Sequence, residues 1–416
     1  MKTKRRNTII AISSIVLGFI LLTIGTCLLA HFSPNKIYIE SEEDLINMSN
    51  QKDGYYVLNR DITLTKSWTA IGSKDEPFSG SLVGNGHTIS FLGLEEPFAR
   101  NEIDDTVYYS FFGHLTGTVL RTKFYGIHAK IKETSKENLL YSSIAYTNNG
   151  RITSCELANS GITLDGNNVC AGLLAAKNYG NIKNCGVYAQ LEATVSGNCF
   201  LGGIIGEMND GIVEQTKRET TTYFKINSNC ETNDYKVGLG TIIGAMYGGT
   251  AKNNLCGCAS NSINNSGKEK VFIGGVSGLI NPKQSILIQN NYCINKSFFG
   301  SNSNSDRFSG GIAGCFENKH QTNSIKITNC VIELDSNFLV KTSGAYTSMI
   351  GEGYENSNIE IINMYSTLFK AYGDHNNQCG VDTVSYSDLS LRKLNWNEAI
   401  WNINKDGILF LKGKIE

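Results

Sequence analysis

The chain has 416 residues, and its 37 basic and 38 acidic side chains leave a formal net charge of −1 at pH 7. This balance provides no basic surface of the kind that binds nucleic acid, so we expect no nucleic-acid partner. The content of 43 glycines argues against a mainly helical protein, because glycine destabilises a helix interior.

The start of the chain predicts a membrane anchor. Residues 1–7 are rich in Lys and Arg, whereas residues 8–32 contain no Lys, Arg, Asp or Glu and are mostly apolar. About 20 apolar residues span a bilayer, and a basic flank stays in the cytoplasm. We therefore predict a cytoplasmic tail at 1–7 and a transmembrane signal anchor at 8–32. The protein would then be a single-pass protein of the cell membrane with residues 33–416 extracytoplasmic.

Two other interpretations of this segment remain open. It could be a signal peptide that is cleaved, which would release a secreted protein, although no clean small-residue cleavage site follows it. Alternatively, Cys27 could carry a lipid, although Thr26 before it departs from the usual bacterial lipoprotein signal.

Residues 33–77 predict an N-terminal cap and a first coil. Apolar residues at 37–39 indicate a strand, and Ser41 followed by acidic residues indicates a capped helix start. The ends of repeat arrays need atypical capping units, so we interpret residues 37–50 as the cap. Apolar residues at 55–58 and 62–64 then predict the first strands of the stack.

Residues 78–366 contain a repeated unit. Each copy has a glycine cluster, a polar turn and a short run with apolar residues at every second position, such as Ile325 and Ile327 around Lys326. This alternation is typical of a half-buried strand. Strong clusters occupy 202–206, 240–244, 274–278 and 310–314, and weaker copies end at Gly113, Tyr146, Ala175 and Gly351. Copies recur at intervals of roughly 30 to 40 residues, a period typical of solenoids.

Specific segments resemble a known family. Residues 78–89 read Phe-Ser-Gly-Ser-Leu-Val-Gly-Asn-Gly-His-Thr-Ile, and residues 401–404 read Trp-Asn-Ile-Asn. Together with the glycine clusters, these segments resemble bacterial GLUG-motif repeat proteins, over roughly residues 37–411. The resemblance implies an exported or surface protein with right-handed parallel β-helix repeats. The predicted fold is therefore an all-β, right-handed parallel β-helix (β-solenoid) of about eight to nine coils, with an N-terminal transmembrane helix and small helical caps.

Glycine, asparagine and two longer polar segments have expected places in this fold. Glycine supplies tight corners with positive φ, and asparagine at the turns tolerates left-handed backbone and can stack in ladders. Residues 95–109 and 216–236 are polar and interrupt the period. They predict insertions between coils, which in repeat proteins place loops on one face.

Residues 367–416 predict a C-terminal cap. Residues 387–394 look like a short helix and residues 407–411 like a last strand. Between them, Trp396 and Trp401 are expected to close the open end of the core rather than to bind a ligand.

Twelve cysteines raise the question of disulfides and metal sites. Cys155, Cys185 and Cys330 share one repeat position, Cys256 and Cys293 match it more loosely, and Met364 replaces it. The alternation points this position inward, so we expect a ladder of small buried side chains, as free cysteine is well suited to the interior. Disulfides remain an alternative in an exported protein, although stacked parallel Cβ vectors are poorly aimed for them. Metal binding is disfavoured, because the sequence has neither the second cysteine pair nor the histidines that a zinc site requires.

No motif for catalysis is present in the sequence. The zinc-protease signature His-Glu-x-x-His is absent, and His87 is expected to be a turn residue. Polysaccharide-cleaving enzymes need paired acidic groups, but no two neighbouring copies carry an acid after the glycine cluster. The residues at that position are His114, Thr147, Ala176, Glu207, Ala245, Leu279, Cys315 and Glu352. No catalytic, cofactor-binding or metal-ligating residue is therefore predicted, and no cofactor.

Three functions remain open at this point. The first is a non-enzymatic surface module for adhesion or binding, anchored in the membrane, with a glycan or a host or cell-surface protein as its ligand. The second is a polysaccharide-cleaving β-helix enzyme, a lyase or glycoside hydrolase, whose acids come from non-equivalent positions. The third is a purely structural component of the cell envelope.

Overall fold

The computed structural model describes residues 35–133, 138–218, 223–257, 260–295, 297–300, 307–317, 323–334, 346–351, 359–366, 381–383, 390–404 and 408–412. The chain divides into two units, Met1–Ile37 and Tyr38–Glu416, and the fold described below belongs to the second. The predicted tail at 1–7 and anchor at 8–32 lie outside the described residues. Among the residues that are described, no helix has the length and apolar character needed to cross a membrane.

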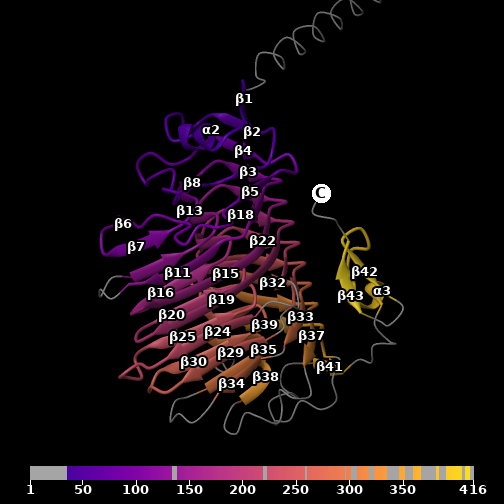
Figure 1. Cartoon of the computed structure of the whole chain (residues 1–416). Coiled ribbons are helices and arrows are strands. Elements are labelled where there is room, and N and C mark those ends of the chain that lie inside the picture. Colours follow the sequence, from indigo (N-terminus) through magenta and orange to yellow (C-terminus); the bar gives the residue numbers. More distant parts are fainter. Residues whose placement is uncertain are drawn as a thin grey trace, which may run out of the picture. The chain divides into compact units, whose positions relative to one another are not determined.

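Most described residues belong to three sheets of stacked short strands, which we call sheets A, B and C (Figure 1). Sheet A consists, in spatial order, of β1 (Lys36–Ile39), β2 (Tyr55–Leu58), β4 (Ser81–Val83), β9 (Thr118–Leu120), β14 (Arg151–Thr153), β18 (Asn181–Lys183), β22 (Ile212–Glu214), β27 (Gly249–Lys252), β32 (Ile286–Gln289), β36 (Ile325–Thr328) and β39 (Ile359–Ile362).

Sheet B has a main path and a side path. The main path is β3 (Ile62–Thr63), β5 (Thr88–Ser90), β10 (Lys123–Tyr125), β15 (Glu156–Gly166), β19 (Gly186–Val195), β23 (Lys217–Arg218), β28 (Leu255–Cys256), β33 (Tyr292–Asn295), β37 (Val331–Leu334), β40 (Met364–Ser366) and β41 (Val381–Thr383). Beside it lie β11 (His128–Lys132), β24 (Tyr223–Ser228), β29 (Ser260–Asn265) and β34 (Ser297–Gly300).

Sheet C contains two rows of strands. The first row is β6 (Asn101–Ile103), β7 (Thr106–Tyr109), β12 (Asn138–Tyr141), β16 (Asn168–Gly172), β20 (Cys199–Gly202), β25 (Lys236–Gly240), β30 (Lys270–Gly274), β35 (Arg307–Phe316) and β38 (Tyr346–Ile350). The second row is β8 (Phe112–Leu115), β13 (Ala145–Asn148), β17 (Ala175–Asn178), β21 (Ile205–Met208) and β26 (Ile243–Met246), followed by β31 (Ser277–Ile280), which pairs with the second half of β35.

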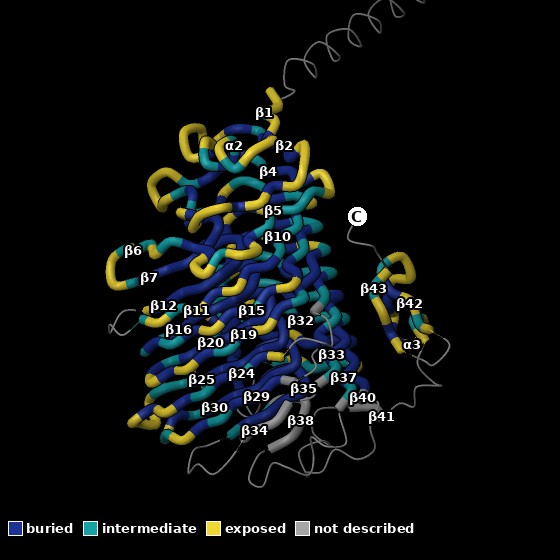
Figure 2. Tube along the Cα trace, in the orientation of Figure 1, coloured by how far each residue is buried: buried dark blue, intermediate teal, exposed yellow. Residues whose placement is uncertain are grey.

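Each turn of the chain contributes one strand to every row. In one turn, β16 and β17 lie in sheet C, β18 in sheet A and β19 in sheet B, and each pairs in parallel with its equivalent in the next turn. Apolar residues therefore stack on apolar residues, as Ile152 does on Ile182 and Ile182 on Val213, and the strands are largely buried while exposed residues gather in the turns (Figure 2). The predicted all-β parallel β-solenoid is confirmed. Its right-handed winding stays a prediction.

The number of turns is smaller than predicted. The described residues form about seven turns rather than eight to nine. The reason is that a complete turn needs a strand in every row. The N-terminal strands β2 to β5 have only isolated bridges toward sheet C, such as Ile71 with Phe112, so they do not make a full turn.

The glycine clusters have a different role from the predicted one. None of the glycines with positive φ lies in the strong clusters; in the described residues they are Gly72, Gly86, Gly93, Gly126, Gly211 and Gly249. Instead, the cluster glycines allow close backbone contact. A Cβ on Gly240 would lie 1.8 Å from the Ile243 carbonyl oxygen, and one on Gly244 would lie 2.8 Å from the Phe200 carbonyl carbon. Glycine is required here because the two rows of sheet C approach each other too closely for any side chain.

A column of buried residues runs through the interior at the start of sheet B. The register places one residue per turn in this column: Thr122, Cys155, Cys185, Thr216, Asn254, Asn291, Cys330 and Met364. The prediction of an inward ladder is confirmed for Cys155, Cys185, Cys330 and Met364. Cys256 and Cys293 are also buried and face each other, but they lie two residues further along. Asn254 and Asn291 take the predicted place.

Residues just before this column adopt left-handed backbone, as expected for asparagine at turns. Asn253, Asn290 and Asn329 have φ of 56°, 53° and 53°. Their amides also stack, because Asn290 Nδ2 donates to Asn253 Oδ1 over 3.2 Å. The predicted asparagine ladder is therefore present in this turn.

The two predicted insertions are largely parts of the sheets. Within 95–109, β6 and β7 form an antiparallel hairpin, and β7 joins it to the parallel strands of the first row of sheet C. Within 216–236, Thr216 belongs to the buried column and β24 pairs with β19 and β29. Their polar residues misled the sequence interpretation, since alternate residues of these strands face outward.

The helix expected near the N-terminus is present, whereas the C-terminal elements do not close the end of the stack. Helix α2 (Glu42–Asn47) starts at Ser41, whose hydroxyl accepts a hydrogen bond from the Asp44 amide over 3.2 Å. At the other end, α3 (Leu391–Leu394) precedes the hairpin of β42 (Trp401–Ile403) and β43 (Leu409–Leu411).

The two tryptophans are buried, as predicted, but on the side of the stack. Trp396 and Trp401 pack with Tyr292, Val331 and Tyr365, which are register partners in three successive turns of sheet B. A cap over the open end would touch the last turn alone. The Trp396 indole N–H also donates to the Asn329 carbonyl oxygen over 2.8 Å, so the C-terminal hairpin covers the outer face of sheet B.

Candidate functional site

The outer face of sheet C carries two facing columns of side chains. The first-row column consists of Tyr108, Leu140, Cys170, Phe200, Gly238, Phe272 and Phe308. The second-row column consists of His114, Thr147, Lys177, Glu207, Ala245, Leu279 and Cys315. Apolar clusters form toward both ends of these columns, around Tyr108 and Leu140 and around Phe272 and Phe308. The charged pair Lys177 and Glu207 lies between them.

A cavity of about 250 Å³ opens at this charged pair. Its lining residues are Thr106, Asn138, Leu140, Asn168, Val169, Cys170, Lys177, Asn198, Phe200 and Glu207. The cavity therefore combines amide side chains, an apolar wall and one pair of opposite charges. We refer to it as the sheet C cavity.

The apolar wall depends on a glycine of the repeat. A Cβ on Gly206 would lie 2.7 Å from Cys170 Sγ and 2.8 Å from the Ala176 carbonyl oxygen. Because Gly206 has no side chain, Cys170 occupies this space beside Leu140 and Phe200, its column neighbours in the adjacent turns. The glycine cluster thus shapes the cavity as well as the bend between the two rows.

The amides of the cavity are oriented by backbone hydrogen bonds. The Asn198 N–H donates to Asn168 Oδ1 over 2.9 Å, and the Lys236 N–H donates to Asn198 Oδ1 over 2.9 Å. Since a backbone N–H requires an acceptor, the oxygen of each amide is engaged and the Nδ2 group remains available as a donor. Asn168 and Asn198 therefore present hydrogen-bond donors at the cavity.

Burial and charge control the ionisation of the cavity residues. Burial raises the pKa of Glu207, and the positive charges of Lys177 and Lys283 oppose this effect. Burial lowers the pKa of Lys177, but Glu207 together with Tyr146, Cys170 and Tyr179 raises it, and the net shift is upward. Lys177 is therefore charged at neutral pH, and it favours the carboxylate form of Glu207.

The thiol in the cavity is unsuited to nucleophilic chemistry. Burial raises the pKa of Cys170 well above that of a free thiol, and the charge of Glu207 raises it further. The thiolate is the reactive form of cysteine, so Cys170 remains a neutral, apolar wall residue at physiological pH.

A one-residue shift between turns hides this site in the sequence. The weak copy near residue 175 was aligned on Ala175, whereas the register places Ala176 with Tyr146 and Gly206. This one-residue error assigned Ala176, instead of Lys177, to the position next to Glu207. Alignment of Asn148 with Asn178 would have corrected it, because both are buried and Asn148 Nδ2 donates to Asn178 Oδ1 over 2.7 Å.

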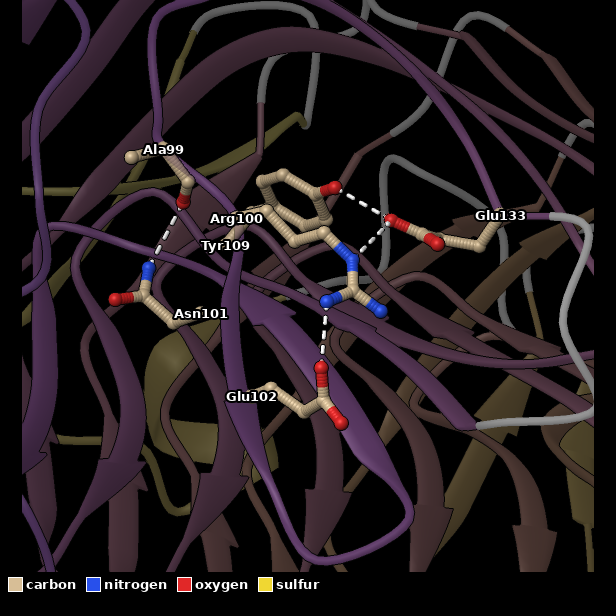
Figure 3. A network of polar contacts seen from close by, with 6 residues as sticks. All are labelled: Ala99, Arg100, Asn101, Glu102, Tyr109 and Glu133. Carbon is tan, nitrogen blue, oxygen red and sulfur yellow. Dashed lines mark hydrogen bonds and ion pairs between the residues drawn. The ribbon is translucent and has the colours of Figure 1, made fainter.

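A polar network holds the hairpin that supplies Thr106 to the cavity (Figure 3). Arg100 Nε donates to Glu133 Oε1 over 3.2 Å, and Arg100 Nη1 donates to Glu102 Oε2 over 2.6 Å. The Tyr109 hydroxyl also donates to Glu133 Oε1 over 2.6 Å. Burial raises the pKa of Tyr109, with Glu133 adding to the shift, so the hydroxyl stays protonated. We interpret this network as structural, because it ties both ends of the hairpin to the end of β11.

A second cavity of about 280 Å³ lies on sheet B, where β15 bulges between Ala158 and Ser160. It is lined by His128, Asn159, Ser160, Gly161, Tyr188, Ala189 and Gln190. His128 is its only basic residue among those described. This second cavity has fewer charged lining residues than the sheet C cavity.

Other polar residues outside the cavities are dispersed. His87 lies in the turn between β4 and β5, as predicted, with its Nδ1 3.3 Å from Asp61 Oδ1. Asp104 is at the tip of the β6–β7 hairpin, where its φ is 52°. Within the described ranges, no three side chains of His, Cys, Asp or Glu gather as a metal site requires.

Comparisons with known proteins identify no family and give low similarity to solved structures. No family model matches the chain, so the GLUG-motif likeness stays a resemblance, and a comparison with curated proteins gave no match. Among solved structures, a candidate immunoglobulin A1 protease from Bacteroides ovatus is 16% identical with a TM-score of 0.44, covering 91% of this chain and 92% of that one. A structure described as IgA1 Protease is 15% identical with a TM-score of 0.42, covering 80% of this chain and 22% of that one. At these values the similarity concerns the course of the backbone alone.

Proposed function

We propose that this chain is a surface-displayed, non-enzymatic binding module, anchored in the membrane by residues 8–32, whose sheet C cavity holds a saccharide. The observation that carries the proposal is the composition of the cavity. Amide donors from Asn168 and Asn198, the charged pair Lys177 and Glu207, and an aromatic side chain, Phe200, line one space of about 250 Å³.

These groups match the chemistry of a sugar. Hydroxyl groups pair with amide donors and with a carboxylate that accepts two hydrogen bonds. The C–H face of a sugar ring packs against an apolar or aromatic side chain, and Phe200 is half-buried at the cavity wall. Ligand sites in proteins typically combine an apolar lining with a few oriented polar groups.

The same residues favour binding over cleavage. Glycoside hydrolases use two carboxyl groups on opposite sides of the scissile bond, and Glu207 is the only carboxylate among the lining residues that the structure describes. The raised pKa of Glu207 is one feature of a general acid. We therefore keep polysaccharide cleavage as the alternative that the binding experiment must test.

The test is a glycan array probed with the full-length chain in detergent, followed by chromatography of the bound oligosaccharides after long incubation. We expect retention of intact glycans and loss of retention in Lys177→Met. The matched control is Lys183→Met in β18, whose amino group pairs with Glu214 over 2.8 Å on the outer face of sheet A and should leave binding unchanged. Release of shortened or unsaturated sugars would establish the cleavage alternative, and equal loss in both variants would argue against the cavity.

The location is tested separately in intact cells. If residues 8–32 form a signal anchor, protease added outside should degrade residues 33–416 while the N-terminal tail stays protected. Recovery of a mature protein beginning near residues 31–34 would instead show cleavage and secretion.

A further inference from the structure

The sheet C cavity offers three different kinds of contact within one small volume. Asn168 and Asn198 present amide donors, because their oxygens already accept backbone N–H groups. Glu207 presents an acceptor that the neighbouring charge of Lys177 helps to keep ionised. Leu140, Cys170 and Phe200 form an apolar wall in consecutive turns. A ligand group that satisfies all three must have an acceptor, a donor and a small apolar end close together.

We propose that the sheet C cavity recognises an N-acetylated amino sugar through its acetamido group, an inference that rests on the proposed saccharide-binding function. The acetamido carbonyl accepts hydrogen bonds from Asn168 or Asn198, its N–H donates to the Glu207 carboxylate, and its methyl group contacts Leu140 and Cys170. Each part of the group then meets a partner of matching chemistry.

The spacing of the cavity groups supports this assignment. Asn168 and Asn198 belong to adjacent turns, as do Lys177 and Glu207, so both pairs are about one strand spacing, roughly 4.8 Å, apart. The donors lie on the first row and the acceptor on the second row of the same cavity. A planar amide held between the rows would direct its oxygen toward the first row and its N–H toward the second.

The size and charge of the cavity disfavour other sugars. Its volume of about 250 Å³ lies just below the range of pockets that enclose drug-sized ligands, which leaves room for a single sugar residue. An acidic sugar would add a second carboxylate beside Glu207, which already balances the charge of Lys177, and like charges in a buried site repel. A neutral sugar without the acetamido group would leave buried polar groups unpaired, and sites of this kind reject such analogues strongly.

The experiment compares matched sugars on the full-length chain in detergent, by isothermal titration calorimetry. We expect N-acetylglucosamine or N-acetylgalactosamine to bind at least tenfold more tightly than glucose, galactose, glucosamine or glucuronate. Glu207→Ala should reduce the affinity for the acetylated sugar at least tenfold. Glu207→Gln, which keeps an acceptor oxygen, should retain more of it, and Glu360→Gln on the outer face of sheet A should have no effect.

The outcomes separate the inference from the function on which it rests. Equal binding of glucose and N-acetylglucosamine, or preference for glucuronate, would overturn the acetamido assignment while the saccharide-binding function stands. No binding of any saccharide on the array or in the calorimeter would overturn both. Thermal unfolding of each variant identifies any that fail to fold, and Phe200→Leu then provides an independent variant that should weaken binding of the acetylated sugar.

Discussion

Lys177 and Glu207 are register partners in consecutive strands of sheet C, β17 and β21, and each shifts the pKa of the other. The pair lies between two apolar clusters on the same face. Its position makes the ionisation of Glu207 depend on burial and on Lys177 together, and this dependence can be measured through stability.

The first prediction concerns the pH dependence of unfolding. The pKa of Glu207 is raised above its ordinary value of 4.5 by burial, so the native state holds this proton to a higher pH than the unfolded chain. Unfolding free energy therefore falls as pH rises from about 4.5 through the raised pKa, and the full loss is present above it. Below pH 4.5 Glu207 is protonated in both the native and the unfolded state, so this loss of unfolding free energy is absent.

Glu207→Gln removes this titration. Urea unfolding at pH 4 and pH 7.5 should show the variant gaining stability relative to the wild-type protein as pH rises, because only the wild-type protein loses stability when Glu207 ionises. Lys177 stays charged throughout this interval and adds no titration of its own. A difference between the two proteins that is constant with pH, or that changes in the opposite direction, would contradict the raised pKa.

The second prediction concerns the glycine clusters. Gly244→Ala places a methyl group 2.7 to 2.9 Å from backbone atoms of Gly206, Phe200 and Leu201, which cannot move aside without separating the rows of sheet C. We expect a loss of about 1–3 kcal/mol, as for overpacked cores, measured by chemical denaturation. Gly161→Ala is the control, since its Cβ would meet only His128 Nδ1 at 3.4 Å and should change stability little.

The third prediction tests the inward and outward alternation. Ile327 is 1% exposed, so Ile327→Asp buries a carboxylate without a partner and should cost several kcal/mol. Lys326, the next residue, is exposed and pairs with Glu360 over 2.9 Å. Because exposed ion pairs contribute about 0–1 kcal/mol, Lys326→Gln should be nearly neutral in the same unfolding assay. Comparable losses from the two substitutions would be inconsistent with the register of β36.

The fourth prediction concerns the cysteines of the buried column. Cys155 and Cys185 are free and buried, and the Cys155 N–H donates to Cys185 Sγ over 3.4 Å. Burial raises the pKa of Cys185 well above its usual range, so this thiol should resist alkylation in the native state, and burial alone should protect Cys155. We expect Cys155→Ala or Cys185→Val to fold with a loss of about 1–2 kcal/mol.

Mass spectrometry of the alkylated, unreduced protein checks this prediction directly. Removal of a structural disulfide would cost about 2–5 kcal/mol, more than either substitution should. A recovered peptide in which Cys155 is linked to Cys185 would refute the free ladder.

Local patterns in the sequence were sufficient to predict the repeat and the N-terminal cap. The alternation of Ile325, Lys326 and Ile327 predicted which side chains face inward, because successive residues of any strand point to opposite sides. Ser41 before a run of acids predicted the start of α2 for an equally local reason, since a side chain caps the backbone only a few residues away.

Features that depend on two segments meeting required the tertiary structure. Polar residues in 216–236 indicated a loop, yet β24 pairs with β19 and β29, and no single segment carries that information. Likewise, Trp396 and Trp401 are apolar in any context, but only the fold shows that they cover Val331 and Tyr365 on the side of sheet B.

The sequence by itself determined the period, the strand alternation and the parallel solenoid, because these follow from residues close together in the chain. Only the tertiary structure decided that Lys177, and not Ala176, stands beside Glu207, since a one-residue shift between turns changes which side chains meet. It also decided that the cluster glycines serve close backbone contact, which is a property of two strands packed together and not of either alone.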